Sequence, residues 1–162
     1  MTAAELKTLR EALGLSVSWL AIQAGVRVRT VNYWESGKTP VPQDVEEIMR
    51  ELEAQALTAV NQAVETYIAS GSPGEVTLLR YRTDADLWKY REDMRGLPAT
   101  FHAAMLYRAS YALRDNGANV HMIYESEAYE SWRKSQDLAD SEASRAAWAT
   151  LLSDSTKKSE SE

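Results

Sequence analysis

Side chains that can form paired hydrogen bonds with nucleic-acid bases occur between residues 27 and 39 of this 162-residue chain. Arg29 and Asn32 are three residues apart, a spacing that places both on one face of a helix. A guanidinium can donate two hydrogen bonds to guanine O6 and N7, and a carboxamide can form a similar pair with adenine N6 and N7. The chemistry that these residues indicate is the reading of base edges in the DNA major groove.

We therefore expect base contacts from the outward face of this segment and phosphate contacts from its flanks. Val28 can pack against a thymine methyl group, and Tyr33 can reach a base edge or a phosphate. Hydroxyl and ammonium groups beside this face suit the phosphate backbone. The expected base contacts are Arg27, Val28, Arg29, Asn32 and Tyr33, and the expected phosphate contacts are Ser16, Ser18, Lys38 and Thr39.

Two short helices and a tight turn must position these side chains. A helix-turn-helix constrains particular positions, because its two helices cross closely around the turn. Counted from Val17, position five is the small Ala21, where the helices touch, and position nine is Gly25, which favours positive φ in the turn. The inward positions are Leu20, Ala24, Val26, Val31 and Trp34. A helical bundle with an inert polar face is the alternative, and the joint match at seven positions favours DNA reading.

The N-terminal part of the chain is predicted to be entirely helical. The predicted helices are Ala3–Leu13, Val17–Ala24, Arg27–Glu35 and Gln43–Ser70. Thr2 and Glu5 have the spacing of a capping box, and Ser16 can cap the second helix. The last segment is either one long helix or two helices that meet near Leu57.

The strongest break in the chain is Gly71-Ser-Pro-Gly74, and we place a domain boundary there. Beyond it the predicted elements are a strand over Val76–Arg82, a helix over Asp84–Met94 capped by Asp84, a helix over Ala99–Arg114, a strand over Val120–Tyr124 and a helix over Glu125–Leu152. Ser153–Glu162 has the composition of a disordered tail. The expected domains are therefore a helix-turn-helix domain over 1–70 and a C-terminal α/β dimerisation domain over 75–152.

Charge is distributed unevenly along the chain. The net charge is −6, but residues 1–40 carry +2 and the remainder carries −8. A basic N-terminal region on an acidic body would bind polyanions through a local patch, with little steering by the whole molecule.

Composition argues against several other classes of protein. The chain has no cysteine, and two histidines are too few for a convincing zinc site, so no metal is expected. A glycine-rich phosphate loop and a catalytic triad are both absent from the sequence, so we expect no enzyme and no cofactor. The sequence has no run of eighteen apolar residues and no secretory signal at its N-terminus, which favours a cytoplasmic protein without a membrane partner.

Three features of the C-terminal half have ordinary explanations. Basic and aromatic residues alternate over residues 80–95, as in single-strand binders, but the acidic residues among them favour a solvated face with ion pairs. The apolar helix over Ala103–Leu113 is expected to be core or dimer interface. His102 and His121 are expected to be ordinary structural or surface histidines.

Several motifs resemble the Cro/cI-type (XRE-family) helix-turn-helix domain. They are Leu9-Arg10, Leu13-Gly-Leu-Ser16, Leu20-Ala21, Gly25-Val26, Thr30-Val31 and Trp34-Glu35-Ser-Gly37. Residues 1–124 are also similar to the anti-CRISPR-associated phage autorepressors. The resemblance implies a mostly α fold with a small α+β part, whose N-terminal bundle is lambda-repressor-like and whose C-terminal part has about two strands. Arg27 departs from the family pattern, which usually has a serine as the helix N-cap.

One helix-turn-helix covers too little DNA for tight specific binding, so a homodimer on a palindromic double-stranded operator is expected. The resemblance implies that such a dimer represses its own operon at an inverted repeat. Two alternatives remain at this stage: an antitoxin-like protein whose C-terminal half binds a protein partner, and a regulator whose C-terminal half senses a small molecule.

Overall fold

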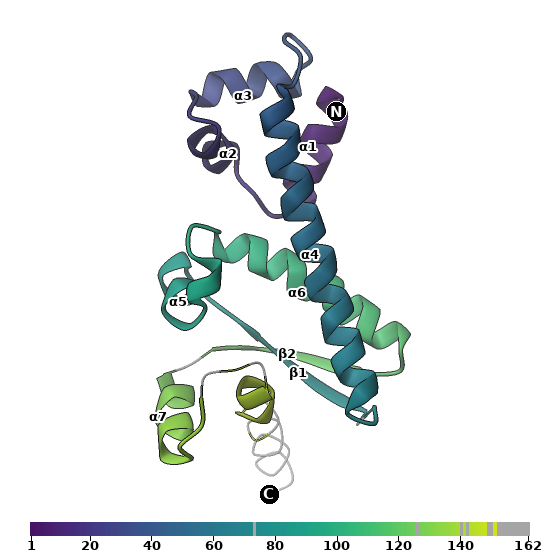
Figure 1. Cartoon of the computed structure of the whole chain (residues 1–162), viewed down its shortest axis with the longest axis vertical. Helices are drawn as coiled ribbons and strands as arrows, with labels where there is room; N and C mark the ends of the chain where they lie inside the picture. Colours follow the sequence, from purple (N-terminus) through teal and green to yellow (C-terminus); the bar gives the residue numbers. More distant parts are fainter. Residues whose placement is uncertain (73, 126, 140, 142, 149–150, 152–162) are drawn as a thin grey trace, which may run out of the picture.

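The computed structural model describes residues 1–72, 74–125, 127–139, 141, 143–148 and 151. The elements are α1 (Ala3–Ala12), α2 (Val17–Gln23), α3 (Val28–Glu35), α4 (Gln43–Ala69), β1 (Glu75–Arg80), α5 (Asp84–Tyr90), the 3-10 helix η1 (Glu92–Met94), α6 (Ala99–Asp115), β2 (Asn119–Tyr124) and α7 (Glu127–Ser135). The expected class, mostly α with a small α/β part, is confirmed. Four layers follow one another along the long axis: α1–α3, then α6, then the strands, then α7 (Figure 1).

The first helices form where local signals place them. Thr2 and Glu5 make both hydrogen bonds of the predicted capping box at the start of α1. The Ser16 hydroxyl accepts a hydrogen bond from the Trp19 N–H at 3.0 Å and so caps α2. Apolar residues one turn apart then meet in a common core, in which Leu6, Leu13, Leu20, Val31 and Met49 are fully buried.

α4 is one continuous helix of 27 residues. Leu57, where two helices could have met, lies on its exposed side with 59% of its surface accessible. Its buried residues recur every three or four positions: Val45, Met49, Leu52, Ala56, Val60 and Tyr67. At 1.5 Å per residue α4 is about 40 Å long, and it runs from the α1–α3 layer to the strands (Figure 1).

A single hydrophobic cluster joins the helices on both sides of Gly71–Gly74. It holds Leu6 and Leu13 of the N-terminal helices together with Leu87 and Phe101 from the C-terminal half. The two halves also touch through polar groups, because the Thr100 hydroxyl donates a hydrogen bond to the Gly14 carbonyl at 2.5 Å. Gly14 has φ +67°, and a Cβ at this position would overlap the Thr100 carbonyl oxygen. This close approach therefore requires glycine.

β1 and β2 form a parallel pair, and α5, η1 and α6 make the connection between them. The register runs from Glu75 opposite Asn119 to Arg80 opposite Tyr124. Val120 packs with Tyr67 and Leu113 in a second, smaller apolar cluster. Since side chains alternate along a strand, every second strand residue faces α4 and α6.

The structure corrects the predicted start of the helix over Asp84–Met94. Thr83, and not Asp84, caps α5 by accepting a hydrogen bond from the Asp86 N–H at 3.1 Å. The Asp84 carboxylate instead accepts a hydrogen bond from the Ala99 N–H at 2.7 Å, at the start of α6. The predicted helix is also divided at Arg91, where the backbone leaves the helical conformation between α5 and η1.

The predicted strand Val76–Arg82 is shifted, since β1 covers Glu75–Arg80 and the Tyr81 side chain is buried in the main cluster. The predicted helix Glu125–Leu152 is interrupted after Ser135, where Asp137 adopts φ +53°, and residues 143–148 are helical again. This reversal lets Trp148 pack against Tyr129 and Trp132. The predicted tail, Ser153–Glu162, lies outside the described residues. In the part of the chain that is described, no helix is both long and apolar enough to cross a membrane.

Candidate nucleic-acid interface

α2 and α3 are joined by the tight turn that the sequence predicts. Gly25 adopts φ +64°, and the N–H groups of Gly25 and Val26 donate to the carbonyls of Ile22 and Ala21 at 3.2 and 2.9 Å. These two bonds form a Schellman closure, which satisfies the last carbonyls of α2. Where the helices cross, Ala21 and Val31 are both buried. The inward positions of the template are therefore placed as expected.

α3 presents its other side to solvent. The exposed residues of this face are Val28, Arg29 and Asn32, and Tyr33 is half-buried beside them. Arg27 is the N-cap residue, but its side chain makes no capping hydrogen bond. Its exposed guanidinium is thus available to an external ligand at the N-terminal edge of α3. All five expected base contacts belong to α3 or to its N-cap, and α3 lies at the end of the molecule far from α7 (Figure 1).

Two cations lie over the ring of Tyr33. The Arg29 guanidinium carbon is 5.5 Å from the ring centroid, and the Lys38 ammonium nitrogen is 5.0 Å from it. Such contacts hold long side chains near one position at little cost. Among the residues that the structure describes, none forms an ion pair with Arg27, Arg29 or Lys38. The face therefore carries positive charge that nearby carboxylates do not neutralise.

The expected phosphate contacts occupy two flanks of this face. Lys38 and Thr39 are exposed directly after α3, where the Lys38 N–H donates to the Tyr33 carbonyl at 2.9 Å. Ser16 and Ser18 are exposed at the start of α2. The Ser16 oxygen already accepts the capping hydrogen bond, but its hydroxyl proton is still available to a phosphate oxygen.

A buried ion pair that the sequence analysis missed fixes the end of α3. Arg10 of α1 donates from Nε to Glu35 Oε1 at 2.5 Å and from Nη2 to Oε2 at 3.1 Å. A third hydrogen bond, from Nη1 to the Leu15 carbonyl, is 2.8 Å long. The hydrogen bond to Glu35 raises the pKa of Arg10 above its ordinary value. The signal was in the sequence, because Arg10 occupies a position in the apolar stripe Leu6, Leu9, Leu13.

α2 is also tied to the C-terminal half of the molecule. Trp19 Nε1 donates to the Gly96 carbonyl at 2.9 Å, and Trp88 Nε1 donates to the neighbouring Leu97 carbonyl at 2.7 Å. On the other side, Arg108 Nη2 donates to the Ala12 carbonyl at the end of α1. The hydrogen bonds of Trp19 and Arg108 thus tie α2 and α1 to α6 and the loop before it. They join residues 77 and 96 positions apart, which no local pattern predicts.

Comparisons with known proteins agree with this geometry. Residues 3–60 match the family described as "Helix-turn-helix domain". Over 72 residues the chain is 40% identical to the Aca2 repressor of Pectobacterium phage ZF40, and this alignment covers 44% of the chain and 61% of that relative. The chain thus spans about 61% of the length of the curated relative that it matches. The predicted resemblance is confirmed: residues 3–60 form a helix-turn-helix domain of the XRE-like type.

Proposed function

We propose that this protein is a sequence-specific DNA-binding transcriptional repressor that acts in the cytoplasm. The observation that carries the proposal is the exposed face of α3, where Arg29 and Asn32 point outward beside unpaired positive charge. In a docked helix-turn-helix the second helix enters the major groove with its N-terminal residues leading. Arg27, Val28, Arg29, Asn32 and Tyr33 would then meet bases, and Ser16, Ser18, Lys38 and Thr39 would meet phosphates.

The repressor is proposed to act as a homodimer on an inverted repeat, and to regulate its own operon. One module offers few base contacts, while a two-fold axis doubles them and matches a palindromic operator. The net charge of −6 adds no attraction to phosphates beyond the local patch, so affinity must come from paired modules.

Fluorescence anisotropy with the DNA upstream of the gene tests this function. A labelled duplex that contains an inverted repeat is expected to bind at least a thousandfold more tightly than a scrambled duplex of the same composition. The affinity should also fall as salt is raised, because bound phosphates release counterions. Equal affinity for both duplexes would contradict sequence-specific repression.

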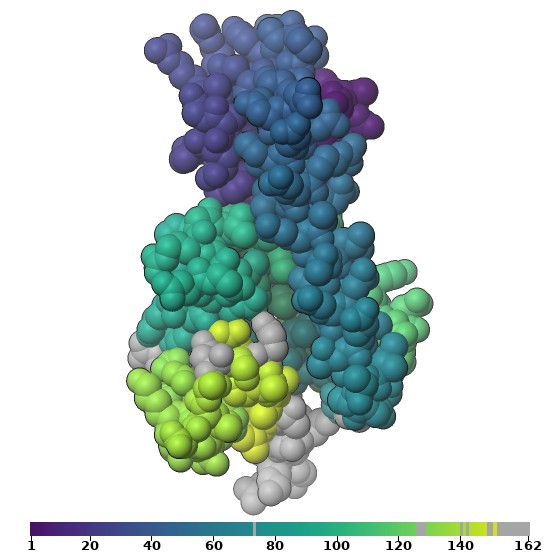
Figure 2. Space-filling model, viewed as in Figure 1, coloured from purple at the N-terminus to yellow at the C-terminus, as the bar shows by residue number. Residues whose placement is uncertain are grey.

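A ligand-sensing regulator is a second candidate, favoured by one observation. A groove of about 580 Å³ lies between α4 and the α5–α6 region (Figure 2). Apolar residues such as Met94 and Met105 line it together with polar ones such as Gln55 and Arg91. This volume is in the range of small-molecule sites. A compound that binds the protein and releases it from its operator would support this candidate.

A further inference from the structure

β2 has one edge that the sheet does not use. The N–H groups of Asn119 and Glu125 donate to the carbonyls of Gly74 and Arg80 at 2.6 and 2.8 Å. In a parallel pair, alternate residues of a strand direct their backbone groups to the same neighbour. Val120, Met122 and Tyr124 therefore direct theirs away from β1. The Val120 carbonyl confirms this direction, because it accepts a hydrogen bond from Arg114 of α6 at 3.3 Å.

The residues of β2 itself do not protect this edge against pairing, although Arg114 contacts the Val120 carbonyl and Arg82 lies over the Tyr124 ring. The six residues of β2, NVHMIY, include no proline, lysine or carboxylate, the residues with which natural edge strands are commonly blocked. Met122 and Tyr124 are 41% and 44% exposed. The described part of the chain has only two strands in this sheet, fewer than the three that a sheet usually needs for independent stability. Pairing with a further strand would therefore increase the stability of the sheet.

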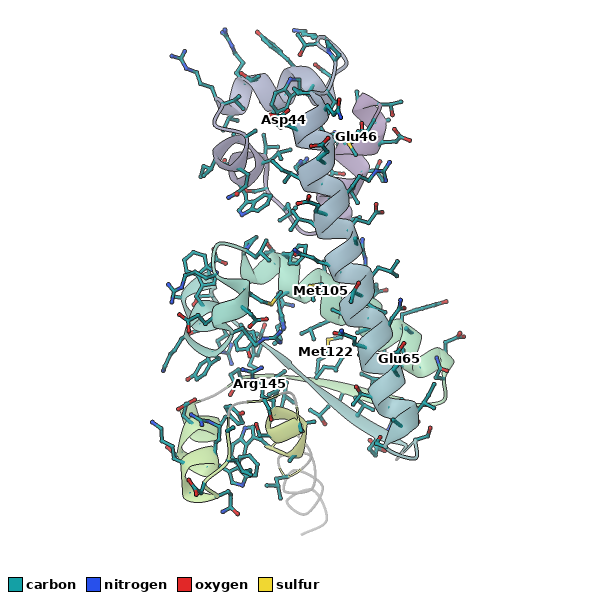
Figure 3. All side chains as sticks on the ribbon, in the orientation of Figure 1. Asp44, Glu46, Glu65, Met105, Met122 and Arg145 are labelled. Carbon is teal, nitrogen blue, oxygen red and sulfur yellow. The ribbon has the colours of Figure 1, made fainter. Side chains whose placement is uncertain are left out.

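An aromatic stripe on α6 lies next to the same edge. Tyr107 and Tyr111 are one helical turn apart and 68% and 70% exposed. Arg114, the next residue of this stripe, reaches the Val120 carbonyl at the edge of β2. Met122 lies on the α6 side of the sheet (Figure 3). Tyrosine and methionine are enriched at the centres of protein–protein interfaces, so the stripe and the edge form one surface suited to a protein.

We propose that β2 pairs antiparallel with β2 of a second copy, around a two-fold axis at Met122, to give a four-stranded sheet. The inference rests on the proposed function, which needs two copies. The backbone groups that β2 directs away from β1 belong to residues 120, 122 and 124. A pair centred on Met122 uses all of them, with the Val120 carbonyl accepting a second hydrogen bond beside the one from Arg114. Met122 then faces the partner's Met122, and Val120 faces the partner's Tyr124. About six backbone hydrogen bonds result.

The direction of the axis is consistent with DNA binding by both copies. An edge-to-edge antiparallel pair has its two-fold axis perpendicular to the sheet. The layers are stacked along the long axis of the molecule, with α3 at one end, so this axis runs along the molecule (Figure 1). Both α3 helices consequently lie at the same end of the dimer. A two-fold contact through the α7 end would direct them to opposite ends, where they could not share one operator.

The other edge of the sheet is a poorer candidate. The charged residues of the sheet, Glu75 and Arg80, both belong to β1. The tyrosine stripe of α6 adjoins β2 through Arg114. A self-complementary contact through β2 closes after two copies, which leaves no edge of β2 for further chains.

Single cysteines test the position of the axis, because the chain has no cysteine of its own. Met122→Cys places two thiols opposite each other, with Cα atoms about 5.5 Å apart, within reach of a disulfide. His121→Cys is the matched control: it lies on the same strand and is exposed, but its two copies would be roughly 8 Å apart, beyond that reach. Under mild oxidation we expect a covalent dimer on a non-reducing gel from Met122→Cys alone.

Sedimentation velocity tests the contact without cross-linking. Met122→Lys places two like charges opposite each other at the axis and is expected to raise the dimer dissociation constant at least tenfold. Ile22→Lys adds the same charge to an exposed apolar position of α2 and should leave the constant unchanged. Circular dichroism and thermal unfolding establish that both variants are folded.

The possible outcomes distinguish a failure of the proposed β2 contact from a failure of the proposed function. A parent protein that sediments as a dimer, combined with no cross-link from Met122→Cys, would overturn the β2 contact while leaving a dimeric repressor intact. A parent protein that stays monomeric at tens of micromolar would overturn the contact itself. A cross-linked dimer that binds no operator would support the contact and contradict the function.

Discussion

The exposed side chains of the two halves differ in kind. The exposed side chains of α3 include the cationic Arg29 and the amide Asn32, while those of α6 and β2 include Tyr107, Tyr111 and Met122. The helices α3 and α6 are both amphipathic, since each directs an apolar stripe to the interior and its other side to solvent. The difference indicates that one chain offers two separate contacts: a charged one that suits phosphates and bases, and an apolar one that suits a protein.

The two halves also bury polar groups in different ways. The N-terminal half buries Arg10 as a member of an ion pair. Its guanidinium donates hydrogen bonds to the Glu35 carboxylate and to the Leu15 carbonyl. The C-terminal half buries His102 with only 5% of its surface exposed, and its Nδ1 atom has no hydrogen-bond partner among the described residues. Burial lowers the pKa of His102 to about 4, and the positive charge of Arg91 adds to this effect. One half therefore holds a buried charge and the other holds a buried neutral base.

The largest expected effect comes from breaking the buried pair. Arg10→Met removes the partner of Glu35 and leaves its carboxylate in the interior, which should lower the free energy of unfolding by about 3–5 kcal/mol. Arg50→Met is the matched control, because Arg50 forms a half-exposed pair with Glu53 that water screens. It should therefore change the free energy of unfolding much less than Arg10→Met does. Urea unfolding of both variants checks this. Similar losses would mean that burial of the Arg10 pair does not matter.

The second effect is a pH dependence that belongs to the C-terminal half. Because the pKa of His102 is lower in the folded state, about 4 against 6.5 when unfolded, the unfolded chain takes up a proton first as the pH falls. Stability is complete above pH 6.5, declines between 6.5 and 4, and has lost about 3 kcal/mol below that window. Chemical denaturation from pH 8 to pH 4 measures it.

Two variants assign this pH dependence to one imidazole. His102→Phe retains an aromatic ring beside Tyr81, whose ring centroid lies 5.0 Å away, but cannot take up a proton. It should flatten the decline between pH 6.5 and 4. His121→Gln removes the other, exposed imidazole and should retain the decline. A decline that persists unchanged in His102→Phe would refute the assignment.

The third prediction concerns the contact between the halves. Gly14 and Gly25 have similar positive φ angles, but only at Gly14 would a Cβ meet another part of the chain, the backbone of Thr100. Gly25→Ala should cost about 1 kcal/mol from backbone conformation alone. Gly14→Ala should cost about 1–3 kcal/mol more, because α6 must move away. Thermal unfolding compares the two, and equal costs would show that α6 does not pack tightly against Gly14.

The smallest expected effects separate base contacts from phosphate contacts on α3. Arg29→Ala should weaken operator binding by about 1–3 kcal/mol and relax the preference at one base pair. Lys38→Ala should weaken binding to all sequences alike. It should also reduce the slope of log affinity against log salt concentration by about one, the contribution of one phosphate contact. Anisotropy titrations with single-base operator variants distinguish the two. An Arg29→Ala protein with the parent affinity and preference would remove Arg29 from the base contacts.

The N-terminal half was predictable because its signals are local. The Thr2 and Ser16 caps and the Gly25 turn act within a few residues, so helix ends and the crossing of α2 and α3 followed from spacing alone. In the C-terminal half the strands were found, but their parallel pairing depends on residues 44 positions apart. Thr83 was missed as a cap because Asp84 is an equally good candidate, and only the proximity of Ala99 decides between them. The continuity of α4 past Leu57 likewise depends on the packing of α6.

The parallel register of β1 and β2 has a consequence for the order in which the helices and the sheet fold. Helix contacts among α1, α2 and α3 close short loops, which is fast, whereas pairing Glu75 with Asn119 closes a long one and must wait. During synthesis, the α1–α3 unit emerges from the ribosome before β2 exists. Each chain is thus expected to complete its sheet late, so the edge that we propose for dimerisation would form only at that last stage.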